Sequence, residues 1–593
     1  MSKTGESTDE GLVRALGVPT LTASIVNATV GAGIFVLPAL VAARLGPAAP
    51  IAFLICAVAM TLIVTSFAIA GSRVSLTGGL YAYVEVAFGR YVGFLAGVLL
   101  WLTNVLAVAG VASALVASIA LVLPAVQNGF GRFVLLVLIF LALATINIRG
   151  VRAGAGTVAS LTVAKLLPLL LFVSVGLFFV RPEAISWPAW PDSASIGQTV
   201  LLLIFAFMGV ELALVPSGEV KNPARTVPRS IFLALAITTV LYIAIQVVAQ
   251  GVLGPELANF TDAPLAEAAS RFLGATGKSI ILAGAAISAF GYVSGDILGS
   301  PRTLYAFGRS GVLPEKMAAV HPRFRTPHIA IGVHAIIACA LAVSSTFQYL
   351  AILSNIAALL LYLFCCAATF ELIRRNVRAD GPPFSIHRLL IVPILAVAFL
   401  LWIFPDPTLI KFAGAGVVLA AAWFLREKIV PLIAVGVVVW ILSHATLSEF
   451  AVAAFVLVIA SALYGLRRLP YVGRHWRGEI SLPKSYWING VLVFGLGCNF
   501  LLLLAATLTA ALFLRAGNPA LAAFVIVVEL ALNISAYIWA LVGIWRSAKK
   551  FQGPRIWSIL ARVATALGVL MSLGRLAQDL QFIEKISRSL ASP

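Results

Sequence analysis

Two short stretches of the chain could bind a small polar molecule through backbone groups. In the first, Gly31, Ala32 and Gly33 interrupt an otherwise apolar segment. Glycine permits open backbone geometry and lets a ligand approach main-chain atoms closely. The half-helix that follows would direct its free N–H groups and the positive end of its dipole at a carboxylate. Close packing of helices through small residues is the alternative interpretation of the same pattern.

A second apolar segment has a similar interruption at Met208 and Gly209, followed at once by Glu211. Inside a bilayer, an exposed N–H or C=O group is costly unless protein, water or ligand satisfies it. Two such breaks in corresponding segments of two repeated halves indicate a binding site near the middle of the membrane, as in secondary transporters. The paired breaks therefore favour ligand binding over helix packing.

Three ionisable residues, Lys165, Glu211 and Asp296, lie well inside apolar segments, where charge is costly and usually functional. Lys165 is too far from either end of its segment to reach the membrane surface easily. Ser288, Tyr292 and Asp296 follow one another at intervals of four residues, which places them on one helix face. We interpret the three charged residues as candidates for proton coupling or gating. Lys165 and Asp296 could form an ion pair with each other. A purely structural role is the alternative for each.

The elements that must position these residues are membrane helices. Of the 593 residues, 61% are hydrophobic and 11% are charged, which is less than half the charged fraction of an ordinary soluble domain. The mean hydropathy is +1.05. Many segments reach the roughly 20 apolar residues that cross about 30 Å of hydrocarbon. The sequence therefore predicts an all-α, polytopic membrane protein.

The lengths of the apolar runs and the charged residues between them predict about 14 membrane spans up to residue 466 and two or three more after it. With a cytoplasmic N-terminus, most arginines and lysines of the short loops fall on the inside, as expected for a multi-pass protein of the cell membrane. The predicted spans are 19–43, 49–71, 90–122, 131–148, 157–180, 196–218, 229–253, 276–308, 328–346, 349–373, 388–404, 408–425, 429–443, 447–466, 488–514, 519–545 and, interrupted by Arg562, 556–574.

Four regions follow from this pattern. We interpret residues 1–18 as a cytoplasmic segment and 19–375 as a ten-helix core with an inverted repeat. We interpret residues 376–466 as two helical hairpins. The dipeptides Val-Pro, Trp-Ile and Thr-Leu each occur twice in this region, 38 residues apart, which indicates a tandem duplication. Residues 467–593 form an appended membrane module, whose role the sequence does not indicate.

An ordered set of short motifs across about residues 12–375 resembles the amino-acid permeases of the amino acid–polyamine–organocation superfamily. That resemblance implies the LeuT-type inverted-repeat fold. The family usually has twelve spans, so the additional hairpin and the C-terminal module depart from it. The matching motifs are Gly31-Ala-Gly-Ile-Phe35, Thr77-Gly-Gly-Leu-Tyr81, Asn147-Ile-Arg-Gly150, the stretch from Phe205 through Pro228, Pro301-Arg-Thr-Leu-Tyr305 and Gly311-Val-Leu-Pro314.

The resemblance also implies roles for individual residues. Lys165 would put its ammonium group where sodium-coupled relatives hold a cation, and Glu211 would sense protons or gate the substrate. Gly31 and Gly209 would open the backbone at the two breaks. The amides of Ala32, Gly33 and Ile34 would hold a substrate carboxylate, and the carbonyls of Thr29, Phe205 and Met208 would accept hydrogen bonds from its ammonium group.

Other functional classes are disfavoured. The net charge of +19 is spread over short loops, which membrane topology explains better than a nucleic-acid partner. The five cysteines and six histidines lack metal-ligand spacing, and the sequence has no phosphate loop or nucleophile elbow. We therefore predict no metal, no cofactor and no enzymatic activity. The oligomeric state remains open.

The sequence is interpreted as a secondary active amino-acid transporter that works by alternating access, coupled to protons or to an exchanged solute. Spans one, two, six and seven would rock against spans three, four, eight and nine. A membrane sensor that binds amino acids without transport is an alternative. Ala32 and Met208 favour substrates with neutral side chains, whereas Glu211 and Asp296 leave open a cationic amino acid or a polyamine.

Overall fold

The computed structural model describes residues 17–74, 79–126, 128–149, 155–186, 191–211, 220, 222–377, 429–467, 479, 481–486, 488, 540–554 and 556–563. The elements of these residues are α-helices and short 3-10 helices, so the predicted all-α class is confirmed. Six helical stretches within them are long and apolar enough to cross a membrane. The predicted spans 388–404, 408–425, 488–514 and most of 519–545 lie outside the described residues.

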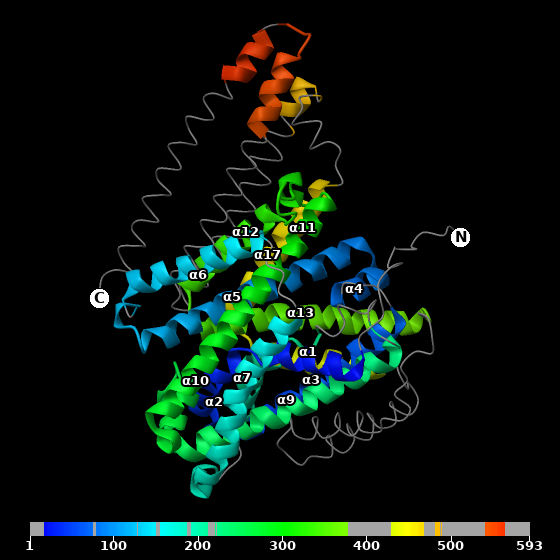
Figure 1. Cartoon of the computed structure of the whole chain (residues 1–593). Coiled ribbons are helices and arrows are strands. Elements are labelled where there is room, and N and C mark those ends of the chain that lie inside the picture. The colour runs from blue at the N-terminus through cyan, green and yellow to red at the C-terminus, as the bar shows by residue number, and fades with distance from the viewer. Residues whose placement is uncertain are drawn as a thin grey trace. The chain divides into compact units, whose positions relative to one another are not determined.

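The chain divides into two compact units, Met1–Ala306 with Lys316–Ala445, and Phe307–Glu315 with Thr446–Pro593. The short helix α11 (Pro301–Arg309) crosses the boundary between them, and α17 (Leu447–Arg467) belongs to the second unit. Within the described residues, the larger unit contains the following α-helices (Figure 1): α1 (Val18–Thr29), α2 (Gly33–Leu45), α3 (Ala49–Arg73), α4 (Leu80–Phe88), α5 (Arg90–Ala120), α6 (Gly129–Arg149), α7 (Ala155–Gly176), α8 (Ser193–Phe207), α9 (Pro223–Leu253), α10 (Pro264–Gly299), α12 (His328–Ser344), α13 (Phe347–Arg374) and α16 (Ile429–Leu442).

Two groups of helices stand out in the larger unit by their contacts. Helix α9 packs against α1, α2 and α3, and α8 packs against α2 and α3; we call α1, α2, α3, α8 and α9 the bundle. Helix α5 packs against α6, α10 and α12; we call α5, α6, α10 and α12 the scaffold. Helix α7 contacts both groups, through α9 and α10. The bundle contains the predicted spans one, two and seven and the described part of span six, and the scaffold contains spans three, four, eight and nine.

The first membrane segment is broken where its glycines predict. Helix α1 ends at Thr29 and α2 begins at Gly33. The Val30 N–H still donates to the carbonyl oxygen of Val26 at 2.9 Å, but the Gly31 N–H turns back to the carbonyl oxygen of Thr29 at 2.8 Å. This tight turn ends the helical pattern, so the backbone groups on both sides of the turn lose their partners within a helix.

The second break lies against the first one. Helix α8 ends at Phe207, Met208 is extended, and Gly209 has a φ angle of +103°. A Cβ atom at Gly209 would lie 3.0 Å from the carbonyl carbon of Ala28 and 3.1 Å from its oxygen. Only a glycine allows both this backbone conformation and this approach. The two interrupted segments therefore meet at Gly209 and Ala28.

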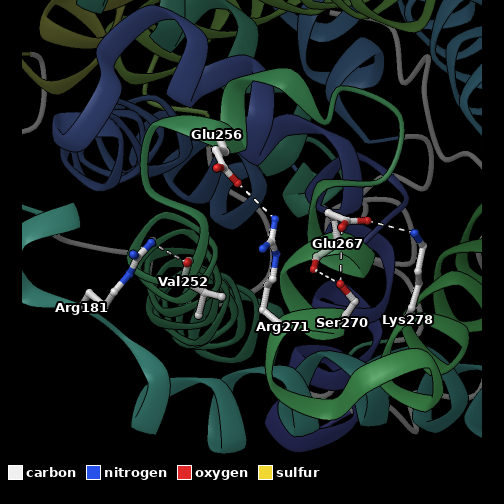
Figure 2. Close-up of polar contacts among 7 residues, drawn as sticks. All are labelled: Arg181, Val252, Glu256, Glu267, Ser270, Arg271 and Lys278. Atoms are coloured by element: carbon white, nitrogen blue, oxygen red, sulfur yellow. Dashed lines mark hydrogen bonds and ion pairs between the residues drawn. The ribbon is translucent and has the colours of Figure 1, made fainter.

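Two ion pairs lie at the start of α10, which is kinked at Gly274. Figure 2 shows both of them, together with a nearby hydrogen bond from Arg181. The Lys278 ammonium lies 2.9 Å from the Glu267 carboxylate across this kink, and Arg271 lies 3.1 Å from Glu256 of the 3-10 helix Gly254–Asn259. The Arg181 guanidinium donates to the carbonyl oxygen of Val252 at 2.9 Å, near the end of α9. These partly exposed ion pairs each stabilise the fold weakly, by about 1 kcal/mol or less.

The smaller unit has its own apolar core. Buried Leu482, Ile544, Ala548 and Ala561 form one cluster, with Tyr486 and Phe551 packed against it. The Arg562 guanidinium lies 6.0 Å from the ring centre of Trp545. The four sequence regions proposed above remain a prediction.

We expect Gly209→Ala to destabilise the protein much more than Gly31→Ala does. A side chain at Gly209 meets the Ala28 carbonyl group and is strained at a positive φ, which typically costs about 1–3 kcal/mol. A Cβ at Gly31 has no atom nearer than 3.9 Å. Thermal unfolding of both variants in detergent measures the difference. Equal unfolding temperatures would contradict the close contact of the two breaks.

Candidate functional site

The break between α1 and α2 presents a row of backbone N–H groups. Among the described residues, the amides of Ala32, Gly33 and Ile34 have no hydrogen-bond acceptor outside α2. They lie at the N-terminal end of α2, where the helix dipole favours negative charge. Ala32 and Ile34 are buried. The arrangement can therefore hold a carboxylate without any charged side chain of its own.

The break after α8 presents backbone carbonyl groups. In a continuous helix the Phe205 carbonyl would accept from the Gly209 N–H, but here this N–H donates to a Glu211 side-chain oxygen at 3.0 Å. Within the described part of the chain, the Phe205 and Met208 carbonyls accept no other hydrogen bond from backbone or side chain. Both groups can accept from a ligand ammonium group.

One tyrosine links the two breaks. The Tyr242 hydroxyl of α9 lies 2.9 Å from the Thr29 carbonyl oxygen and 3.1 Å from the Ala206 carbonyl oxygen. Its side chain is fully buried, between the rings of Phe53 and Phe207. A hydroxyl has a single hydrogen, so it donates to one of these carbonyls at a time. Tyr242 thereby joins the end of α1 to the end of α8.

Lys165 contacts the first break from α7. Its ammonium group donates a hydrogen bond to the Asn27 carbonyl oxygen in the last turn of α1. A cation is favourable there, because the carbonyl end of a helix carries partial negative charge. The expected ion pair between Lys165 and Asp296 does not occur: the structure gives each of them a different partner, so that interpretation is wrong.

Asp296 of α10 instead belongs to a buried polar network in the scaffold. Its Oδ2 atom lies 2.8 Å from Nε2 of His334 on α12, and its Oδ1 accepts from the Ser300 hydroxyl at 2.5 Å. The other ring nitrogen of His334, Nδ1, accepts from the Trp101 indole N–H of α5 at 3.2 Å. The network ties α5, α10 and α12 together.

Tyr292 of α10 lies beside the first break. Its ring lies 3.9 Å from the position that a Cβ of Gly31 would occupy. Asp296 follows Tyr292 by four residues, on the same face of α10. Tyr292 therefore lies next to the glycine break and one helical turn from Asp296.

An aromatic wall borders the same region. A Cβ at Gly33 would lie 3.0 Å from the Phe205 ring, which packs edge-on against Phe347 with centres 5.3 Å apart. The Phe205 ring is thus in close contact with the glycine that begins α2. Gly33 has little room for a larger side chain.

The sequence interpretation missed Tyr242, His334 and Trp101 as candidates. His334 is an ionisable residue inside an apolar segment, so the rule that singled out Lys165 would have found it too. Nothing in the sequence alone distinguishes Tyr242 from other membrane tyrosines. Within the described ranges, no three His, Cys, Asp or Glu side chains come close enough to hold a metal ion.

The chain is similar to known transporters over most of its length. The profile of the family described as "Amino acid permease" matches residues 16–419. The serine/threonine exchanger SteT of Bacillus subtilis is 28% identical over 403 residues, covering 66% of this chain and 90% of that protein. The methylthioribose transporter of the same organism is 30% identical, covering 67% and 89%. The branched-chain amino acid permease BcaP of that organism is 27% identical, also covering 67% and 89%.

The family and these relatives are transporters and not enzymes, which agrees with the functional class predicted from the sequence. The match includes both helix breaks, Lys165 and the scaffold network. The chain is a multi-pass membrane protein that belongs to the amino acid permease family.

Proposed function

We propose that this protein transports amino acids across the cell membrane by alternating access, with its N-terminus in the cytoplasm. The observation that carries the proposal is the meeting of two helix breaks at Gly209 and Ala28. Within the described residues, the first break presents amides and the second presents carbonyls that have no partner. An α-amino acid carries groups complementary to both, because its carboxylate and its ammonium group are attached to one carbon. The named relatives support amino acids as the substrate class.

The substrate carboxylate binds the N–H groups of Ala32, Gly33 and Ile34 at the start of α2. The ammonium group binds carbonyl oxygens of Thr29, Phe205 and Met208. Because these partners are backbone groups, they recognise the part that all amino acids share. The side chain of the substrate then extends towards Phe205 and Tyr292, which border the breaks.

Lys165 couples this site to protons or to the exchanged solute. Its ammonium group holds the Asn27 carbonyl oxygen, and α7 contacts both the bundle and the scaffold. Loss of the proton would weaken this hydrogen bond, so that α1 could move relative to α7. Glu211 has a related gating role, because its carboxylate holds the Gly209 N–H at the second break.

Counterflow in proteoliposomes tests transport against binding alone. We expect vesicles loaded with an unlabelled amino acid to accumulate labelled amino acid from outside, since alternating access exchanges one for the other. A sensor without transport would show saturable binding of labelled amino acid and no accumulation. That second outcome would contradict the proposed function.

Gly33→Val should abolish substrate binding. A valine side chain collides with the Phe205 ring, which lies 3.0 Å from the ideal Cβ position, and fills the space beside the carboxylate-binding amides. The matched control is Gly332→Val on α12, where a Cβ meets no atom within 4 Å. Amino-acid-induced thermal stabilisation reports binding directly. Wild-type stabilisation in Gly33→Val would refute the assignment of this site.

Lys165→Ala should remove the pH dependence of uptake, because the variant has no ammonium group to release its proton beside α1. Lys278→Ala is the control, since this lysine pairs with Glu267 near the kink of α10 (Figure 2). Uptake is measured across a pH series in proteoliposomes. An unchanged profile in Lys165→Ala would exclude its coupling role.

A further inference from the structure

Each oxygen of the Asp296 carboxylate has a hydrogen-bond partner from the protein itself. The Asp296 side chain is 7% exposed and that of His334 is completely buried. One carboxylate oxygen lies 2.8 Å from His334 Nε2, and the other accepts from the Ser300 hydroxyl at 2.5 Å. Hydrogen bonds to a charged acceptor are among the stronger polar interactions in proteins. A cationic ligand group must therefore compete with these donors for the charge of the carboxylate.

Trp101 fixes the direction of the hydrogen bond between His334 and Asp296. An indole N–H can only donate, so Nδ1 of His334 must be the accepting, unprotonated nitrogen. In the neutral ring the hydrogen is then on Nε2, and it points at Asp296. Turning the ring away from Asp296 would break both hydrogen bonds. Trp101 thereby holds His334 as a donor to the carboxylate.

This network lies close to the proposed substrate site. Asp296 follows Tyr292 by four residues on α10, so their Cβ atoms are about 5–6 Å apart on one helix face. The Tyr292 ring lies beside Gly31 in the first break. Asp296 is thus one helical turn from a ring that borders the break.

The other intramembrane charges of this region also have protein partners. Glu211 accepts from the Gly209 N–H, and Lys165 donates to the Asn27 carbonyl. In the described part of the chain, the carboxylates near the site, those of Glu211 and Asp296, each have a hydrogen-bond donor from the protein. A cationic side chain of a substrate therefore finds no carboxylate there without a donor. An uncharged side chain needs no such partner and can lie against the aromatic ring of Phe205.

We propose that Trp101, His334 and Ser300 sequester Asp296 and so make the transporter select amino acids with uncharged side chains over lysine, arginine and diamines. His334 is a positioning residue here: it acts through Asp296 and does not itself contact the substrate. The inference rests on the proposed transport function and specifies its substrate class.

Competition between matched amino acids tests the inference in the full-length wild-type protein. Lysine and norleucine share a four-carbon side chain and differ by the terminal ammonium group. The assay is counterflow of a labelled neutral amino acid, with each compound as competitor. Norleucine should inhibit at concentrations at least about tenfold lower than lysine. Equal inhibition by lysine and norleucine would overturn the inference. If none of the amino acids tested gives counterflow, the transport function itself is refuted.

Variants of the network then test its cause. His334→Leu leaves Asp296 without its main donor, so inhibition by lysine should strengthen about tenfold, in line with one charge-assisted hydrogen bond. His334→Gln still offers an N–H to Asp296 and should keep the wild-type ranking. The double variant His334→Leu with Asp296→Asn removes the carboxylate charge, and its lysine inhibition should fall back to the wild-type level.

The outcomes separate a specificity role from a merely structural one. Gain of lysine inhibition that depends on the Asp296 charge supports the inference. Absence of that gain in folded His334→Leu, or its persistence in the double variant, overturns it. If His334→Leu does not fold, Ser300→Ala carries the test, because it removes the other donor by deleting a single hydroxyl; unchanged lysine inhibition in that variant overturns the inference.

Discussion

The whole architecture depends on one constraint: a helix that is interrupted inside a bilayer leaves N–H and C=O groups that the hydrocarbon cannot satisfy. The described part of the larger unit has interruptions after Thr29 and after Phe207 and brings them together at Gly209. Side chains from elsewhere in the chain satisfy part of what the breaks expose. Tyr242, Lys165 and Glu211 each donate to or accept from a backbone group at a break.

The same contacts connect the breaks with the helices that would have to move. Tyr242 belongs to the bundle, whereas Lys165 belongs to α7, which packs against both bundle and scaffold. Asp296 and His334 are bound to each other within the scaffold. Of these hydrogen bonds, the one from Lys165 to Asn27 joins the bundle to α7, whereas those of Tyr242 and Asp296 hold each group together internally.

Much of the fold could be predicted from the sequence, because apolar run length and charged loops are local signals. The predicted span 131–148 corresponds to α6 (Gly129–Arg149), and 349–373 corresponds to α13 (Phe347–Arg374). The start of α10 was predicted twelve residues late, at 276 instead of Pro264, since the helical turns before Gly274 contain Glu267 and Arg271 and are not an apolar run. The glycines at 31, 33 and 209 predicted the breaks, and at Gly209 the φ angle of +103° is one that few other residues adopt.

The partners of the charged residues could not be predicted in this way. Lys165 and Asp296 are both buried charges in neighbouring helices, and sequence gives no distance between them. In the structure, Lys165 donates to a backbone carbonyl in the last turn of α1. Asp296 lies beside the imidazole of His334, whose other nitrogen accepts from Trp101. Such pairings depend on how distant segments meet, so the roles of Ala32, Gly33, Ile34, Met208 and the charged residues remain predictions.

The single hydrogen of the Tyr242 hydroxyl has a consequence for how a carrier of this kind would cycle. This hydroxyl reaches the carbonyl oxygens of Thr29 and Ala206, but the Thr29 oxygen also accepts from the Gly31 N–H at 2.8 Å. Thr29 therefore keeps one donor even when the hydroxyl turns to Ala206. A carrier of this kind could thus take up an ammonium group at Thr29 and release it again without leaving the last carbonyl of α1 unpaired.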